Sequence, residues 1–224
     1  MSTTVGAITA HIRNEELGPG DRLPSEAQFS KDLSVSRTVV REAFRALAAL
    51  HLIDLSPGKR AVVAQLDYGS MSLLIEHGVV TEQITVQQIY DVRRTIEIRT
   101  ATLAALRRSE AQGQKIVELA KGMQASRDDT QRLMELDIAL HLEIAKAAAN
   151  PIFALIVGAF DGVTRQTWPI GWRSRTTEEQ QVFMLDIHVR LGEAIAAGDP
   201  TTAADLMAKH FDESVRALIA AGIS

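Results

Sequence analysis

The segment SVSRTVVREAFRAL, residues 34–47, carries an arginine at every fourth position: Arg37, Arg41 and Arg45. Residues spaced by four lie on one face of an α-helix, so the three guanidinium groups form a single stripe. A guanidinium group can donate two hydrogen bonds to the edge of a guanine, or it can pair with a phosphate. The pattern therefore predicts a nucleic-acid contact, with an ordinary solvated helix face as the alternative.

A second group of polar residues lies in the C-terminal part of the chain. Asp137 and His141 are four residues apart, and His188 and His210 lie in two later segments. All four lie close in the sequence to leucine, isoleucine or methionine, and buried polar groups need partners. A bound metal would satisfy them together, because three imidazoles and one carboxylate suit Zn²⁺, Ni²⁺, Mn²⁺ or Fe²⁺ rather than Ca²⁺. The alternative is that each histidine is a buried or half-exposed residue without a metal.

The arginine stripe lies in a segment that is expected to fold as a winged helix. Apolar spacing predicts a first helix over about residues 4–16, and Ser25 begins a short second helix after the turn LGPGDRLP. Ser36 then caps a third helix that runs to about Leu50. The stretches LIDLS and RAVVAQL flank a Pro-Gly turn as a small β-hairpin. Three helices and a hairpin predict a winged helix-turn-helix domain over residues 1–66.

In a helix-turn-helix, the second helix of the pair enters the major groove with its N-terminal end toward the bases. Ser36 and Thr38 suit phosphate contacts at the positive end of that helix. Lys59 and Arg60 at the hairpin tip are placed to reach the flanking backbone or the minor groove. The side opposite the arginines is expected to pack in the core, through Val39, Val40, Ala43, Leu47 and Leu50.

The remainder of the chain is expected to be helical. Residues 67–83 form a connector with a short helix near 70–77, and residues 84–224 form an all-α bundle of about six helices. No strand pattern interrupts them, so the fold class is mainly α. The expected breaks between helices fall near residues 109–113, 126–130, 150–151, 168–177 and 198–200.

Composition limits the classes of protein that fit. The 224 residues are 46% hydrophobic and only 4% aromatic, with a net charge of −4. The stretch between Ser36 and Arg60 is locally basic, with five basic and two acidic residues, and local charge matters more for DNA than total charge. The absence of cysteine excludes disulfides and thiolate metal ligands. With no secretory signal and no apolar run of about 18–20 residues, a cytoplasmic protein without a membrane span is expected.

The sequence from Gly18 to Val63 resembles the DNA-binding domain of GntR-type bacterial transcription regulators. It matches their pattern PGxxLPSE, then VSRxxVREALxxL, then a wing that contains glycine. The resemblance implies that Arg37 and Arg41 are the main operator contacts. Ala27 stands where the family often has arginine, and the wing has GKRA where GRGT is common. The predicted DNA-contact set is Arg22, Ser25, Ser36, Arg37, Thr38, Arg41, Arg45, Gly58, Lys59 and Arg60.

Residues 84–215 resemble the FCD domain, the helical effector domain of the FadR branch of GntR regulators. The similarity lies in IYDVRRTIEIRTATLAA, LDIALHLEIAKAAANPIF and HVRLGEAIAAGDPTTAADLMAKHF. It implies a metal, with zinc foremost, on Asp137, His141, His188 and His210, although Leu140 replaces the usual phenylalanine. It also implies that Arg93 contacts a carboxylate effector, the alternative being an ion pair with Glu97. Arg165 and Trp168 are further candidates for the effector pocket.

These observations predict a ligand-responsive, sequence-specific transcription regulator and not an enzyme. A homodimer would bind a palindromic operator and act as a repressor released by a small organic acid bound near the metal. One alternative is a helical metalloenzyme, which would need a general base. Glu135 and Glu143 are close in sequence to the metal ligands, but both would project away from them. The other alternative is a purely structural metal.

Overall fold

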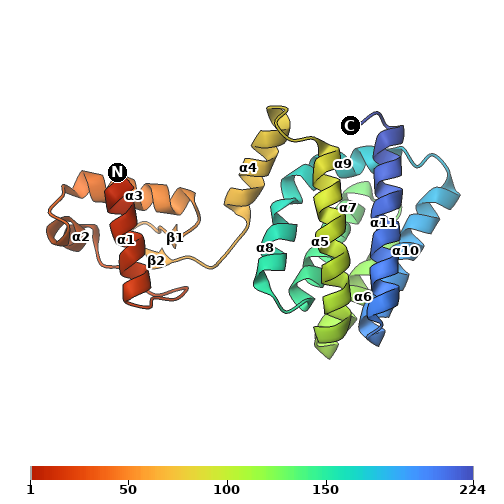
Figure 1. The fold of residues 1–224 in the computed structure, drawn as a ribbon, viewed down its shortest axis with the longest axis horizontal. Helices are drawn as coiled ribbons and strands as arrows, with labels where there is room; N and C mark the ends of the chain where they lie inside the picture. The colour runs from red at the N-terminus through yellow and green to blue at the C-terminus, as the bar shows by residue number, and fades with distance from the viewer. Residues whose placement is uncertain (1, 224) are drawn as a thin grey trace. The chain divides into compact units, whose positions relative to one another are not determined.

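The computed structural model describes residues 2–223 and divides into two compact units, with the boundary between Ser70 and Met71 (Figure 1). The N-terminal unit has three helices and a two-stranded antiparallel sheet in which Ile53 pairs with Val63. This confirms the predicted winged helix-turn-helix. Its elements are α1 (Ser2–Asn14), α2 (Glu26–Asp32), α3 (Arg37–Ala49), β1 (Ile53–Asp54) and β2 (Val62–Val63).

Side-chain caps fix where the two helices of the helix-turn-helix begin. Ser25 Oγ accepts a hydrogen bond from the backbone N–H of Gln28 at 3.2 Å, which starts α2. Ser36 Oγ accepts one from the N–H of Val39 at 3.3 Å, which starts α3. Each cap supplies an acceptor for an N–H group that has no partner within the helix. The N-terminal end of α3, where Arg37 lies, is thus held in a defined place.

The core of the N-terminal unit lies under one face of α3. Val40, Ala43, Phe44 and Leu47 are buried there against residues of α1, α2 and β1. The expectation that Val39 and Leu50 also pack in this core is wrong, because they are 36% and 55% exposed. Val39 lies about 90° from the middle of the buried sector on a helix with 100° per residue. Leu50 is the C-cap residue, where helical periodicity no longer applies.

The C-terminal unit is all-α, as predicted. From residue 84 on it has seven helices rather than about six, because Phe160 ends one helix and begins the next within a segment expected to be continuous. The expected break at 168–177 is shorter, since α9 continues through Pro169 to Arg173. The helices are α4 (Gly69–Val80), α5 (Val86–Arg107), α6 (Glu110–Ala125), α7 (Thr130–Ala147), α8 (Pro151–Ala159), α9 (Asp161–Arg173), α10 (Glu178–Ala197) and α11 (Pro200–Ala220).

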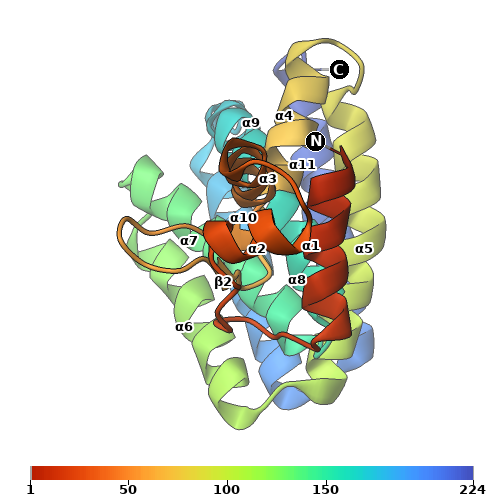
Figure 2. The ribbon, with the colours of Figure 1, turned by 90° about the vertical axis from the view of Figure 1, so that its left-hand side faces the viewer.

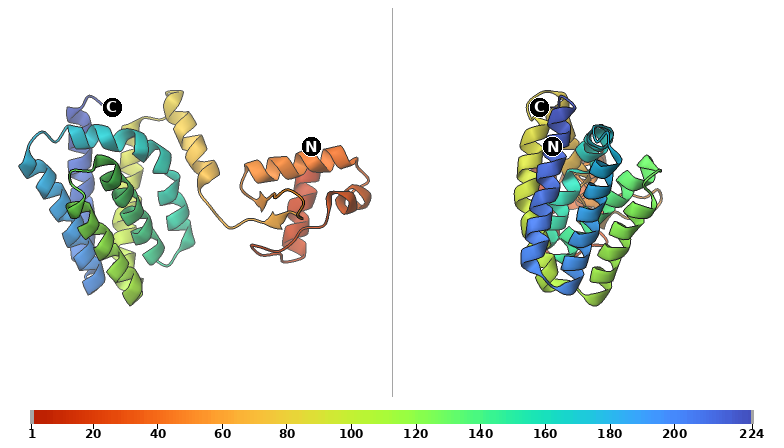
Figure 3. Two further views of the ribbon diagram at one scale, coloured as in Figure 1. Left: turned by 180° about the vertical axis from the view of Figure 1, so that it is seen from behind. Right: turned by 90° about the vertical axis from the view of Figure 1, so that its right-hand side faces the viewer.

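Five of these helices pack in a closed ring. Going round it, α5 packs along α11, α11 along α10, α10 along α6, α6 along α7 and α7 along α5 (Figures 1–3). Fully buried aliphatic and aromatic side chains such as Leu140, Leu191 and Phe211 fill the interior. All the polar residues singled out in the C-terminal sequence except Arg165 and Trp168 lie on ring helices. Within residues 2–223, no helix has both the length and the apolar character that a membrane span requires.

Candidate metal centre and nucleic-acid interface

Three histidines from three helices meet inside the ring. His141 of α7, His188 of α10 and His210 of α11 are all buried, and one nitrogen of each lies within 4.8 Å of those of the other two. Asp137, one turn before His141, is buried beside them. Its Oδ1 lies 3.0 Å from His188 Nε2, in a contact that lacks hydrogen-bond geometry. The structure thus brings together the four residues that were predicted to bind a metal.

The free nitrogens of this cluster show that it suits a cation. His141 Nε2, His188 Nε2 and His210 Nδ1 are shielded from solvent and have no hydrogen-bond partner among the described residues. A buried polar group without a partner costs about 1–3 kcal/mol. A divalent metal would coordinate all three nitrogens, with a carboxylate oxygen as a fourth ligand. The donors present therefore fit a transition metal.

The opposite ring nitrogens of two histidines are held by neighbouring groups. His188 Nδ1 donates to the carbonyl oxygen of Met184 at 2.8 Å, and His141 Nδ1 is hydrogen-bonded to a carboxylate oxygen of Glu97. Because Nδ1 carries the proton in such an arrangement, Nε2 keeps a free lone pair that points toward the cluster. Glu97 is held in turn by Arg93, whose Nε donates to it at 2.8 Å.

The surroundings of Asp137 and His210 keep these two groups in the protonation states that a metal needs. Burial opposes ionisation of Asp137, but the contact with His188 and the nearby imidazoles outweigh it and hold the pKa of Asp137 well below its ordinary value. Burial and the neighbouring histidines together hold the pKa of His210 well below its ordinary value. Asp137 is therefore ionised and His210 is neutral.

A small cavity of about 30 Å³ adjoins the cluster. Arg93 lies in its wall, only 5% exposed, between the rings of Tyr90 and Phe211 at 5.3 and 5.2 Å. Two of the three guanidinium nitrogens of Arg93 already donate hydrogen bonds, Nε to Glu97 and Nη1 to Thr164 Oγ1 at 2.9 Å. The polar and aromatic residues of the wall are Tyr90, Arg93, Asp137, Thr164, Thr167, Trp168, Trp172, Arg175, His188, His210 and Ser214.

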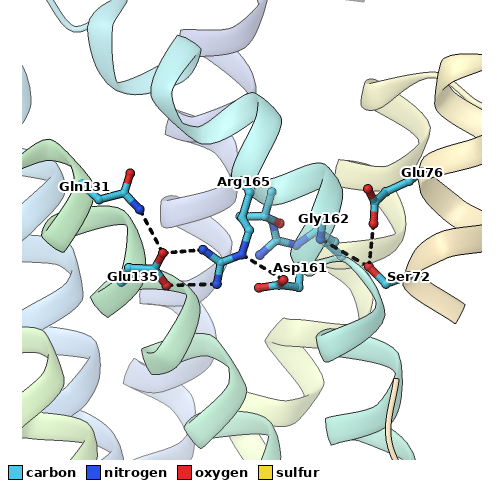
Figure 4. A network of polar contacts seen from close by, with 9 residues as sticks. Ser72, Glu76, Gln131, Glu135, Asp161, Gly162 and Arg165 are labelled. Carbon is cyan, nitrogen blue, oxygen red and sulfur yellow. Dashed lines mark hydrogen bonds and ion pairs between the residues drawn. The ribbon is translucent and has the colours of Figure 1, made fainter. Parts of the chain in front are cut away.

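Of the two further pocket candidates, Trp168 lines the cavity and Arg165 is engaged in a separate network. Arg165 donates to Glu135 of α7 and to Asp161 at 2.9 Å each (Figure 4). The ion pair with Arg165 thus engages Glu135, one of the two glutamates considered as a general base. The other, Glu143, lies 3.8 Å from Lys146.

The same network extends to α4. Ser72 Oγ accepts a hydrogen bond from the N–H of Gly162 at 3.4 Å and donates one to Glu76 at 3.1 Å (Figure 4). A Cβ atom on residue 162 would lie 1.9 Å from Glu76 Oε1, so a side chain at 162 would require the carboxylate end of Glu76 to move.

In the N-terminal unit, all ten predicted DNA contacts are exposed to solvent. Arg41 pairs with Glu26 at 3.1 Å and Arg45 with Glu42 at 2.7 Å, whereas Arg37 makes no ion pair with any described residue. Thr38 is exposed on the first turn of α3, and Ser36 caps it.

The wing and α3 border a common groove. Its volume is about 670 Å³, and its wall includes basic residues from both elements. Gly58 has a φ of +71°, the left-handed conformation that glycine adopts most readily, and so forms the wing turn. The backbone of Arg22 forms an isolated antiparallel β-bridge with Val62. Arg22 and Ser25 both border a second hollow. The basic residues of the larger groove are Arg41, Arg45, Lys59 and Arg60.

Sequence reasoning missed two residues of the C-terminal site. Glu97 was considered only as an ion-pair partner, yet it also holds His141. Its signal is spacing, because residues 90, 93, 97, 101 and 104 follow helical periodicity and are all buried. Arg175 was not considered, and no local pattern marks it.

Two family models match the chain. The model for bacterial regulatory proteins of the gntR family matches residues 2–63, and the FCD domain model matches residues 88–213. The chain belongs to the GntR family. It is a transcription regulator with an FCD effector domain, as the sequence predicted, and regulators of this kind bind operator DNA and small-molecule effectors.

Relatives of known name resemble this GntR regulator over most of its length. It is 29% identical to the HTH-type transcriptional regulator LutR of Bacillus subtilis, over 92% of this chain and 100% of the relative. It is 26% identical to the galactonate operon transcriptional repressor of Escherichia coli, over 89% of this chain and 88% of the relative. The solved structure of Streptococcus agalactiae GntR shares its fold, with a TM-score of 0.72 and 22% identity, covering 96% of this chain and 97% of the other.

Proposed function

We propose that this GntR regulator is a homodimeric repressor whose FCD domain binds a divalent transition metal and a small organic acid. The observation that carries the proposal is the set of three buried, unpartnered imidazole nitrogens beside Asp137 and a cavity. We assign DNA binding to residues 1–66, a connector to 67–83 and effector binding to 84–224. Because operator DNA lies in the bacterial cytoplasm, that is where the protein works.

DNA binding is assigned to α3 and the wing. Arg37 and Arg41 extend from the first two turns of α3, where a recognition helix faces the bases. Arg45 lies one turn further on and suits a phosphate. The wing residues Lys59 and Arg60 neutralise the flanking backbone, and Arg22, Ser25, Ser36, Thr38 and Gly58 complete the contact surface. A palindromic operator requires two copies of this surface, hence a homodimer.

The metal is assigned to Asp137, His141, His188 and His210, with zinc foremost. Zinc prefers nitrogen and carboxylate oxygen donors in small numbers, as this cluster offers. When bound, it is a Lewis acid that can accept a carboxylate oxygen of a ligand. The bonds from Glu97 and the Met184 carbonyl orient the imidazoles for it.

The effector is assigned to the cavity at the cluster. Arg93 has Nη2 left for a ligand, since its other two nitrogens are bonded to Glu97 and Thr164. A divalent metal and a guanidinium group in one buried wall favour an anion, which suggests an organic acid. An acid that binds the free protein more tightly than the operator-bound protein weakens operator binding by the same free energy. Named repressors among the relatives support repression as the direction.

The test combines a metal-content measurement, a thermal melt and an operator gel shift on the full chain. We expect one metal per chain, a lower melting temperature of the FCD unit after chelation, and at least one organic acid that raises that melting temperature and weakens operator binding. The winged-helix unit provides the internal control, because chelation should leave its melting unchanged. If chelation lowers stability but no acid changes the melt or the gel shift, the metal is structural and the sensing role fails.

A further inference from the structure

The cavity at the metal cluster has a neighbour on the other side of two side chains. A second hollow of about 250 Å³ lies against the end of α9 and the helices α10 and α11. Arg175 and Met184 line both this outer hollow and the inner cavity of about 30 Å³. These two side chains are thus common to the walls of both spaces, and they are called the partition below.

Arg175 is half-buried without a counter-ion. It follows the C-cap residue of α9, and its Nη1 donates to the carbonyl oxygen of Gly171 at 2.7 Å. The guanidinium carbon lies 6.0 Å from the centre of the Trp172 ring. Among residues 2–223, no carboxylate oxygen lies within 4.0 Å of this guanidinium. Burial lowers the pKa of Arg175, and the charge of Asp137 only partly offsets this.

The arginines nearby differ from Arg175 in this respect. Arg93 is held by Glu97 at 2.8 Å, and Arg165 is held by Glu135 and Asp161. Each of these two guanidinium groups therefore already has a carboxylate partner within the protein. Arg175 keeps a free positive charge in a partly dehydrated position, where an anionic partner gains more than it would in water.

The size of the inner cavity decides how far a ligand must extend. A cavity needs about 10–15 Å³ to hold one water molecule, so the inner cavity of about 30 Å³ holds two or three. An organic acid of several carbons does not fit there alone. It must pass the partition and continue into the outer hollow, where Ser174 and Gln180 offer polar groups.

We propose that Arg175 is the residue that recognises the effector's carboxylate, and that its side chain is the movable partition between the inner and outer cavities. The inference rests on the proposed function of the FCD domain and names the residue that selects an anionic ligand. The carboxylate takes the place of the Gly171 carbonyl as partner of the guanidinium. The rest of the acid then occupies the joined space, with its polar groups toward the metal cluster.

The test measures the affinity of the zinc-loaded full chain for lactate, malate and gluconate, and for lactamide as a neutral probe, by titration calorimetry. R175Q should weaken the best acid by about 10–100-fold, the range for loss of a hydrogen bond to a charged group. R175K, which keeps the charge but lacks the fork, should lie between R175Q and the wild type. R216Q is the matched control, because Arg216 borders the outer hollow but not the inner cavity, and its side chain is 72% exposed. Its affinity should stay within about twofold of the wild type. Lactamide should not bind.

The outcomes separate this inference from the proposed function. If the wild type binds an acid and R175Q binds it equally well, the role of Arg175 is overturned and the sensing function stands. If R175Q or R175K has lost zinc, measured by mass spectrometry, Arg175 supports the metal site instead and the inference is overturned. If no acid binds the zinc-loaded wild type, the proposed sensing function fails and the inference fails with it.

Discussion

The molecule contains the same ion pair, arginine with glutamate, in two opposite settings. In the winged-helix unit, the side chains of Arg41 and Glu26 are 51% and 34% exposed and pair at 3.1 Å. In the FCD unit, those of Arg93 and Glu97 are 6% and 1% exposed and pair at 2.8 Å. The surface pair contributes about 0–1 kcal/mol, whereas removing one partner of a buried pair costs about 3–5 kcal/mol.

The difference in burial between the two ion pairs matches the difference in their roles. Arg41 can exchange Glu26 for a base or a phosphate at little cost, because an exposed ion pair contributes little free energy and water can solvate both groups. If Arg93 left Glu97, a buried charge would remain without a partner. Arg93 therefore fixes the position of Glu97, and Glu97 fixes that of His141. A contact surface that must bind and release DNA and a site that must hold a metal thus use the same chemistry at different burial.

The largest effect is expected from Asp137→Asn in the FCD unit. The substitution keeps the volume but removes the carboxylate that lies 3.0 Å from His188 Nε2, which is the only carboxylate among the described residues that line the cavity. Metal affinity should fall by more than about 100-fold, which exceeds the loss typical when a residue that hydrogen-bonds to a metal ligand is removed. Competition with a zinc-binding dye measures it. Asp212→Asn, which alters an exposed pair with Arg94, is the control. Unchanged zinc affinity would remove Asp137 from the ligand set.

A smaller effect is expected from Glu97→Gln. The amide can still accept from His141 Nδ1 but no longer neutralises Arg93, so the imidazole is less basic and less firmly oriented. Metal affinity should fall by about 10–100-fold. Glu135→Gln provides the control, since it breaks an arginine pair that is more than one-third exposed on both sides. Equal losses in the two variants would show that burial does not distinguish the pairs.

In the winged-helix unit, Arg37→Ala should weaken specific operator binding by about 1–3 kcal/mol, because Arg37 is free to donate to a base edge. A gel-shift titration at fixed salt measures the change against Arg13→Ala, an exposed arginine on α1. A variant that lost affinity equally for operator and unrelated DNA would show a phosphate contact instead.

The smallest effect is expected from Glu26→Gln, and its sign is opposite. Loss of the carboxylate frees Arg41 from its intramolecular partner, so DNA binding no longer has to replace that ion pair. Operator affinity should rise by about 0.2–1 kcal/mol at low salt and less at high salt. Weaker binding in this variant would mean that Glu26 positions Arg41 for DNA instead of competing with DNA.

Sequence reasoning was most effective where local spacing decides the structure. The caps at Ser25 and Ser36 and the arginine stripe are properties of a few adjacent turns, and the predicted winged helix is confirmed. It failed for Val39 and Leu50 because a helical wheel alone does not locate the centre or the end of the buried face.

The C-terminal site depends on contacts between distant segments. Asp137 and His141 share a turn, so their proximity follows from spacing. Nothing local brings α10 and α11 to α7, so the link from His188 and His210 to Asp137 and His141 depended on the metal hypothesis and on the resemblance to the FCD domain. Arg175 lies beyond the end of a helix that continues through Pro169, so its place in the cavity wall depends on a path that propensity does not predict.

The contact between the Glu76 side chain of α4 and Gly162 of α9 links two positions that are far apart in the sequence. Because a side chain at residue 162 would occupy the place of the Glu76 carboxylate, the length of the residue at 76 and the size of the residue at 162 are coupled. An ancestor that acquired alanine at 162 would have had to shorten Glu76 or displace it from Ser72. Aligned members of the family should therefore show covariation at this pair, with glycine at 162 wherever a long side chain stands at 76.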